Sequence, residues 1–231
     1  MNKGLLKYIS SSLLFLLISI VAGAQNQNQD EQQEEQEKEP LTFYGVKGGL
    51  NIGRFTDFIF KPERFSLEGS VDLNFGNKYF AVAEGGYSKT NLEKDTYHYL
   101  SNGYFIKLGL DYNMLKKYPT DFLGVGFRIA GSSFTQDANN VIIADEHWGN
   151  IPVNIAAQQV NTFWLEGSFG LKAEIFDNIY LGWSALLKIK LSGGNPNFQP
   201  YDIPGYGNGI NAINLGANYY IYYQIPYNRK Q

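Results

Sequence analysis

The chain of 231 residues contains no cysteine. A disulfide, a thiolate nucleophile and a cysteine-ligated metal site are therefore all excluded. Histidine is nearly absent as well, with His98 and His147 as its two positions. No group of glycines has the spacing of a phosphate-binding loop. We accordingly expect no metal and no other cofactor, and we assign no catalytic residue.

The first apolar run, at residues 13–21, is too short to cross a bilayer as a helix, which takes about 20 residues. Lys3 and Lys7 precede it, and the small residues Ala22-Gly23-Ala24 follow it. This order is typical of an export signal, so we predict a signal peptide over 1–24. A retained helical anchor is the alternative. The missing cysteine excludes lipid anchoring through a thiol.

A surplus of positive charge is missing from the body of the chain. Residues 40–231 hold sixteen basic and sixteen acidic side chains, so no net charge steers them towards nucleic acid. The preceding stretch QNQNQDEQQEEQEKE carries six acids against one lysine and has no apolar periodicity. We predict a disordered, acidic Gln/Glu-rich periplasmic tail over 25–40, with a short acidic helix as the alternative.

Glycine and aromatic residues, by contrast, are plentiful: the chain has 25 glycines, 17 tyrosines and 16 phenylalanines. Without long helical patterns, this composition favours many strands joined by tight turns. Eight segments alternate apolar with polar residues, as strands do when their two faces meet different surroundings. These segments are residues 43–53, 65–76, 79–89, 103–114, 122–134, 162–176, 179–191 and 211–225.

The lengths of the segments and of their connections favour a membrane barrel. Each segment has about 11 to 15 residues, whereas soluble strands cluster near 5 or 6 and a tilted membrane strand takes about 9 to 11. Short connections (76–78, 115–121, 176–178) alternate with long ones (54–64, 90–102, 135–161, 192–210). Outer-membrane barrels have this asymmetry between periplasmic turns and outer loops. We predict an all-β fold: an eight-stranded antiparallel up-and-down transmembrane β-barrel over 41–227, with a C-terminal tail at 228–231.

The two faces of these segments carry different residues. One face holds large apolar side chains without charge, which lipid exposure demands because a charge near the bilayer midplane costs about 2–4 kcal/mol. The other face mixes small residues with balanced charges that could fill the narrow interior of an eight-stranded barrel. Phe80 and Val82 share this inward phase with Glu84. The residues predicted to form a polar, ion-paired lumen are Lys47, Glu68, Asp72, Glu84, Lys107, Asp111, Arg128, Glu166, Lys172, Glu174, Lys188 and Lys190.

Aromatic residues recur near the segment ends, where membrane barrels have interfacial girdles. They are Tyr44, Phe75, Tyr79, Tyr112, Phe122, Phe163, Tyr219 and Tyr223. A soluble secreted lipid-binding barrel is an alternative, because alternation alone does not say which face points inward.

Three stretches resemble a family of outer-membrane barrels of unknown function from Bacteroidota. They are WLEGSFGLKAEIFDNIYLGWSALLKIKLS at 164–192, GFRIAGSSF at 126–134 and YDIPGYG at 201–207. The wider pattern, over about 41–227, is similar to the broader group of outer-membrane protein beta-barrel domains. The resemblance implies an outer-membrane barrel and brings no catalytic residues. Glu166, Lys172 and Glu174, which lie in the matching stretch, are interpreted as lumen pairs.

We therefore expect a non-enzymatic protein of the cell outer membrane, in contact with its lipid and monomeric, with a structural, binding or envelope-associated role. Its long outer loops carry the candidate recognition residues Trp148, Phe198, Tyr201 and Tyr206, for an outer or envelope partner of unknown identity. Packing of these aromatics over the barrel mouth is the simpler interpretation.

The alternative function is an enzyme that modifies envelope lipids or glycans through a loop histidine. Such a site could combine His98 with Asp95 and Ser101, or His147 with Asp145 or Glu146. Neither spacing is diagnostic, because a catalytic triad is defined by geometry.

Overall fold

The structure is a computed structural model that describes residues 43–54, 62–75, 78–94, 96–115, 120–145, 149–194, 196 and 198–225. The predicted signal peptide, acidic tail and C-terminal tail lie outside these residues. The same holds for Asp95, Glu146, His147 and Trp148.

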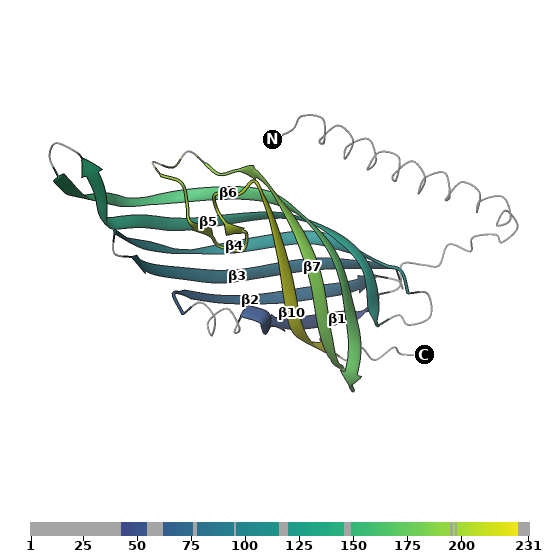
Figure 1. Cartoon of the computed structure of the whole chain (residues 1–231). Helices are drawn as coiled ribbons and strands as arrows, with labels where there is room; N and C mark the ends of the chain where they lie inside the picture. Colours follow the sequence, from purple (N-terminus) through teal and green to yellow (C-terminus); the bar gives the residue numbers. More distant parts are fainter. Residues whose placement is uncertain are drawn as a thin grey trace, which may run out of the picture. The chain divides into compact units, whose positions relative to one another are not determined.

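Eight antiparallel strands form a closed barrel (Figure 1). They follow one another around the ring in chain order, and β10 closes it by pairing with β1. The strands are β1 Phe43–Asn51, β2 Arg64–Phe75, β3 Tyr79–Lys94, β4 Tyr97–Asn113, β5 Phe122–Asp145, β6 Gly149–Phe176, β7 Ile179–Ser192 and β10 Ile213–Ile225. A two-stranded sheet, β8 Asp202–Ile203 with β9 Gly207–Asn208, lies between β7 and β10 in the chain. The prediction of an all-β fold with eight antiparallel strands is confirmed.

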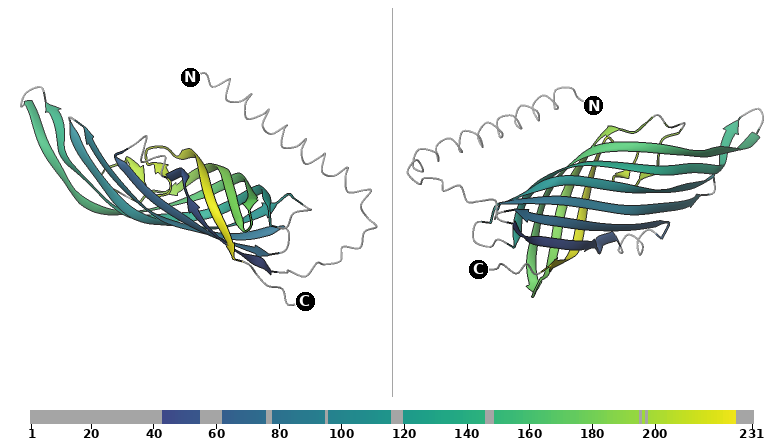
Figure 2. Two further views of the ribbon diagram at one scale, coloured as in Figure 1. Left: turned by 90° about the horizontal axis from the view of Figure 1, so that it is seen from below. Right: turned by 180° about the vertical axis from the view of Figure 1, so that it is seen from behind.

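Two connections predicted as long loops are instead mainly strand. β3 and β4 continue through 90–102 to Lys94 and Tyr97, and β5 and β6 continue through 135–161 to Asp145 and Gly149. Figure 2 shows β5 and β6 running on together past the other strands. The apolar outer face ends before these extensions, and with it the alternation that predicts strands. The backbone ladder continues beyond that face because its hydrogen bonds join main-chain groups and do not require apolar side chains.

Local sequence explains the tight turn between β6 and β7. Asn178 has a φ of 63° in this turn, a left-handed conformation that asparagine tolerates better than most residues. It fixes the register of a hairpin whose strands bring Glu166 opposite Lys188 and Lys172 opposite Gly182. The turn and the register shift between Glu174 and Phe176 together set which residues of β6 and β7 lie opposite each other.

Candidate functional site

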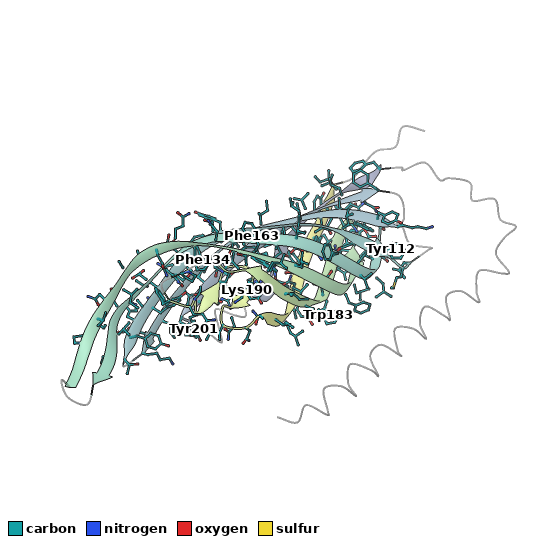
Figure 3. The ribbon with its side chains drawn as sticks, turned by 90° about the horizontal axis from the view of Figure 1, so that it is seen from above. Tyr112, Phe134, Phe163, Trp183, Lys190 and Tyr201 are labelled. Carbon is teal, nitrogen blue, oxygen red and sulfur yellow. The ribbon has the colours of Figure 1, made fainter. Side chains whose placement is uncertain are left out.

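Neighbouring residues on β4 show which face of the barrel wall points inward. Lys107 is 0% exposed, whereas Leu108 is 49% exposed. Leu187 and Lys188 on β7 differ in the same way, at 44% and 4%. Tyr112, Phe163 and Trp183, labelled in Figure 3, are also exposed on the outer wall. Large apolar side chains therefore cover the outside of the described barrel, and charged side chains lie within it.

Lys107 is the centre of a buried ionic cluster. Its Nζ lies 2.7 Å from Glu68 Oε1, 2.9 Å from Glu84 Oε2 and 3.7 Å from Glu166 Oε1. These partners come from β2, β3 and β6, so the cluster links strands from around the ring. A lysine with no exposed surface needs such partners, because an unpaired charge in a low-dielectric interior is very costly.

A second cluster continues the first towards the short-turn end of the barrel. Arg128 Nε donates to Glu84 Oε1 at 3.0 Å, and its Nη2 lies 3.2 Å from Asp111 Oδ1. Lys172 Nζ contacts Asp72 Oδ2 at 2.5 Å and Asp111 Oδ2 at 3.2 Å. Glu84 and Asp111 are shared, so these residues form one continuous set. We call it the lumen network: Glu68, Asp72, Glu84, Lys107, Asp111, Arg128, Glu166, Lys172 and Lys188.

Further polar contacts leave little free space beside the lumen network. The Tyr220 hydroxyl donates to Glu68 Oε1 at 3.0 Å, and Arg54 Nη2 lies 2.8 Å from Glu68 Oε2. A hollow between Asp111, Arg128 and Lys172 measures about 10 Å³, which is room for about one water molecule. Fixed ion pairs and side-chain packing thus occupy this part of the interior.

Three residues predicted for the network have other surroundings. Glu174 is exposed, and its Oε1 accepts a hydrogen bond from the Asn178 backbone N–H at 2.8 Å. Glu174 keeps the inward phase, opposite the buried Tyr180, but it lies at the end of β6 next to the turn, which explains its exposure. Lys190 Nζ donates to the Gly209 carbonyl at 2.5 Å. Lys47 is buried but donates to the Thr120 carbonyl, and its Nζ lies 3.7 Å from the centre of the Tyr180 ring.

Inward aromatic residues fill the barrel next to the charges, and sequence analysis did not identify most of them. Phe122, predicted for an outer girdle, is 2% exposed and packs edge-to-face on Phe80. Tyr222 is also buried, and a Cβ added at Gly49 or Gly182 would lie 2.4 Å or 2.6 Å from its ring. Inward glycines lie opposite these inward rings and leave space for them. This pairing could have identified the rings, but it can be recognised only when the strand register is known.

The connection between β7 and β10 closes the opposite end of the barrel. We call residues 193–212 the mouth loop. Ile203 and Tyr206 of this loop are buried in one apolar cluster with Phe105, Phe134 and Trp164. Gly205 has a φ of 76°, and a Cβ there would lie 2.5 Å from the Phe105 ring. Glycine therefore meets both the backbone and the space requirements of this close approach.

Polar contacts from the wall also hold the mouth loop. Asp202 lies 2.9 Å from Arg64 Nη2 and accepts a hydrogen bond from Thr90 at 3.0 Å. Lys188 Nζ donates to the Gly205 carbonyl at 2.7 Å and lies 3.9 Å from Glu166 Oε2. Lys188 therefore connects the lumen network to the mouth loop.

The candidate recognition residues differ in accessibility. Tyr206 is 1% exposed, packs on Trp164 and donates to the Asn211 and Ala212 carbonyls, so it is not a surface recognition residue. Burial raises the pKa of its hydroxyl. Tyr201 is 45% exposed, and its ring and that of Phe198 each meet Tyr99 edge-to-face. Trp148 lies outside the described residues.

The described part of the chain does not assemble the histidine site proposed as an alternative. His98 Nε2 is hydrogen-bonded to Asn91 Oδ1 at 2.6 Å. Ser101 is buried on the inner face, three residues along β4 and so on the opposite face from His98. The other partners, Asp95, Glu146 and His147, are not described. Among the described residues, no three His, Cys, Asp or Glu side chains are grouped as metal ligands would be.

The fold and its interior define a class: closed eight-stranded antiparallel barrels with an ion-paired interior and an apolar outer wall. The chain belongs to the family described as Domain of unknown function (DUF6048), whose model matches residues 5–230. No curated protein and no solved structure matches the chain. Among the described residues, no helix is long and apolar enough to span a membrane.

Proposed function

We propose that this protein is a non-enzymatic barrel of the outer membrane, with its apolar wall in lipid and its interior closed. The observation that carries the proposal is the contrast between fully buried Lys107 and exposed Leu108. A soluble barrel gains stability by placing such a leucine inside and such a lysine in water, whereas a lipid-embedded barrel gains by the reverse. A soluble lipid-binding barrel also needs an apolar interior for its ligand. The charged lumen network would disfavour a lipid in that position.

The spacing of two aromatic pairs on the outer wall supports an apolar band of about the height that a membrane requires. Tyr79 pairs with Tyr112 at a ring-centre distance of 5.7 Å, and Tyr87 pairs with Tyr104 at 5.0 Å. The two pairs lie on the outer face of β3 and β4, eight residues apart, which is about 26 Å along a strand. The residues between them on this face are alanine, glycine, isoleucine and leucine. At a tilt of about 35–45° this spacing is about 18–21 Å of height, so the pairs would lie just inside the two edges of an apolar band about 25 Å tall.

The direction of insertion follows from the connections. The turns after β2, β4 and β6 would face the periplasm, and the extensions of β3–β6 with the mouth loop would face outward. The resemblance of 164–192 to Bacteroidota barrels supports this compartment. The body would then be a lipid anchor, and the protruding strands would carry the binding or shielding role.

The proposal is tested by expressing the full chain in a Gram-negative host. We expect the protein to stay in outer-membrane fragments after a sodium carbonate wash. We also expect it to migrate differently on a detergent gel before and after boiling, as folded barrels do. Recovery as a monomer in detergent-free buffer would contradict the proposal.

A further inference from the structure

A hollow of about 260 Å³ lies between the mouth loop and the end of β7, apart from the lumen network. Pro200 and Ile203 line it and are buried, whereas Gln199 and Gly194 line it and are exposed. The hollow therefore extends from the interior of the loop to the surface of the molecule. Its volume is slightly below the range of about 300–1,000 Å³ that is usual for drug-sized ligands, so it suits a smaller molecule.

Lys190 is the one charged side chain among the described residues that line this hollow. Lys107 and Lys188 each have a carboxylate partner in the lumen network. No carboxylate among the described residues forms an ion pair with Lys190, and the one acid of the mouth loop, Asp202, pairs with Arg64 instead. The hollow thus carries a positive charge that no described carboxylate contacts.

The contacts of the Lys190 ammonium leave hydrogen-bond donors unused. The group has three N–H donors, and the Gly209 carbonyl accepts one of them, at 2.5 Å from Nζ. The centre of the Tyr206 ring lies 5.9 Å from the same atom, at the outer limit of a cation–π contact. Lys190, labelled in Figure 3, is therefore held against the mouth loop by uncharged groups. They fix the ammonium without neutralising it.

We propose that this hollow binds a small monocarboxylate through Lys190. A half-buried ammonium and a carboxylate form charge-assisted hydrogen bonds, which are about twice as strong as neutral ones. A single lysine matches a single negative charge, whereas phosphate sites usually combine several donors. Pro196, Pro200 and Ile203 offer apolar surface to the body of the ligand, and Gln199 offers an amide at the rim.

A purely structural role for Lys190 is the alternative, because Lys188 also donates to a mouth-loop carbonyl. Lys188 differs in that it is buried and has Glu166 as a carboxylate partner. A lysine that only holds the loop needs neither a missing counter-charge nor a hollow beside it. The proposed site depends only on the docked mouth loop, so it goes beyond the proposed function and does not require a membrane location.

The experiment uses the full chain in detergent micelles and three small acids, acetate, butanoate and glucuronate, each paired with its primary amide. Binding is measured by ligand-observed NMR. We expect at least one acid to bind at least about tenfold more tightly than its amide, a difference of about 1.4 kcal/mol. Lys190→Met should remove this preference, and Lys190→Arg should keep most of it because the positive charge stays.

Gly193→Leu is a second variant, which fills the hollow and leaves the charge of Lys190 in place. A Cβ at Gly193 would have Lys190 Cδ as its nearest neighbour, at 3.9 Å, so the fold has room for it. The matched control is Ser192→Leu, since Ser192 is exposed and does not line the hollow. We expect Gly193→Leu to lose acid binding and Ser192→Leu to keep it.

Three results would overturn the proposal: no binding of any acid, equal binding of acids and amides, or undiminished binding to Lys190→Met. Equal loss in Gly193→Leu and Ser192→Leu would also place the ligand elsewhere. Heat-modifiable migration of each variant shows that the barrel has formed. The carbonate wash tests the proposed function and these binding ratios test the site, so either can fail without the other.

Discussion

At the scale of single residues, two adjacent positions on β4 differ most clearly in their surroundings. Lys107 contacts three carboxylates inside the barrel, and the Leu108 side chain lies exposed on the outer surface. Their side chains point to opposite faces because strand residues alternate. Substitutions at these two positions therefore test the outer wall and the interior separately.

An arginine at Leu108 tests whether the outer wall is in lipid. We expect Leu108→Arg to destabilise the folded protein in phosphatidylcholine vesicles by about 2–4 kcal/mol, measured by urea unfolding. Asn102→Arg is the matched control, since Asn102 is exposed on β4 beyond Tyr104 and should cost at most about 1 kcal/mol. Equal and small effects at both positions would argue for an outer wall in water.

Removing the charge of Lys107 tests the interior. We expect Lys107→Met to cost about 3–5 kcal/mol, because Glu68, Glu84 and Glu166 lose their shared cation while they stay buried. Adding Glu166→Gln to this variant should restore part of the stability, since one of the uncompensated charges is then gone. A cost below about 1 kcal/mol in the same urea assay would mean that water reaches the carboxylates.

At the scale of elements, the mouth loop and the strand extensions have different functions in the fold. The mouth loop is held by buried Ile203 and Tyr206 and by the ion pair of Asp202 with Arg64. The extensions of β5 and β6 instead pair with each other beyond the point where β6 pairs with β7. The loop therefore belongs to the closed interior, whereas the extensions continue past the β6–β7 ladder.

Docking of the mouth loop should depend on pH through Tyr206. The pKa of its hydroxyl is raised in the folded protein above the usual value of about 10. The docked loop thus favours neutral tyrosine, so this stabilisation is complete below pH 10 and is lost as the pH rises through the folded pKa. Trp164 fluorescence, measured with Trp148 and Trp183 changed to Phe, should shift at high pH. The shift should be absent in Tyr206→Phe, and its persistence there would assign it to another group.

At the scale of the whole molecule, the barrel is closed twice, by the lumen network and by the mouth loop. An eight-stranded barrel is only just wide enough for its own side chains. In this one, Lys188 connects the two closures. The arrangement is consistent with the proposed role as a membrane anchor and with the absence of a wide channel through the described interior.

Conductance measurements test this double closure. We expect purified protein to give no stable single-channel current in planar bilayers. A variant with residues 194–211 replaced by a short Gly-Ser linker should also give none, because the lumen network still closes the barrel below the missing loop. A stable current from the intact protein would contradict the closed interior. A current from the loop variant alone would assign the closure to the mouth loop.

The sequence by itself determined the alternation of the strands, and with it their number and the sorting of charges onto one face. These features are local, because side-chain direction repeats every two residues regardless of the rest of the chain. The buried positions of Glu68, Lys107 and Arg128 follow from it. Glu174 shares the inward phase, opposite the buried Tyr180, but it is exposed because it lies at the end of β6 next to the turn.

The tertiary structure alone decided which inward residues meet and where the strands end. Lys107 lies directly opposite Glu84 in the β3–β4 ladder, but it reaches Glu68 on β2 and Glu166 on β6 only because the sheet curls into a barrel. The docked mouth loop, the glycines beside Tyr222 and the length of β6 likewise depend on contacts between segments far apart in the chain. No local pattern encodes such contacts, because they arise from the register and closure of the whole sheet.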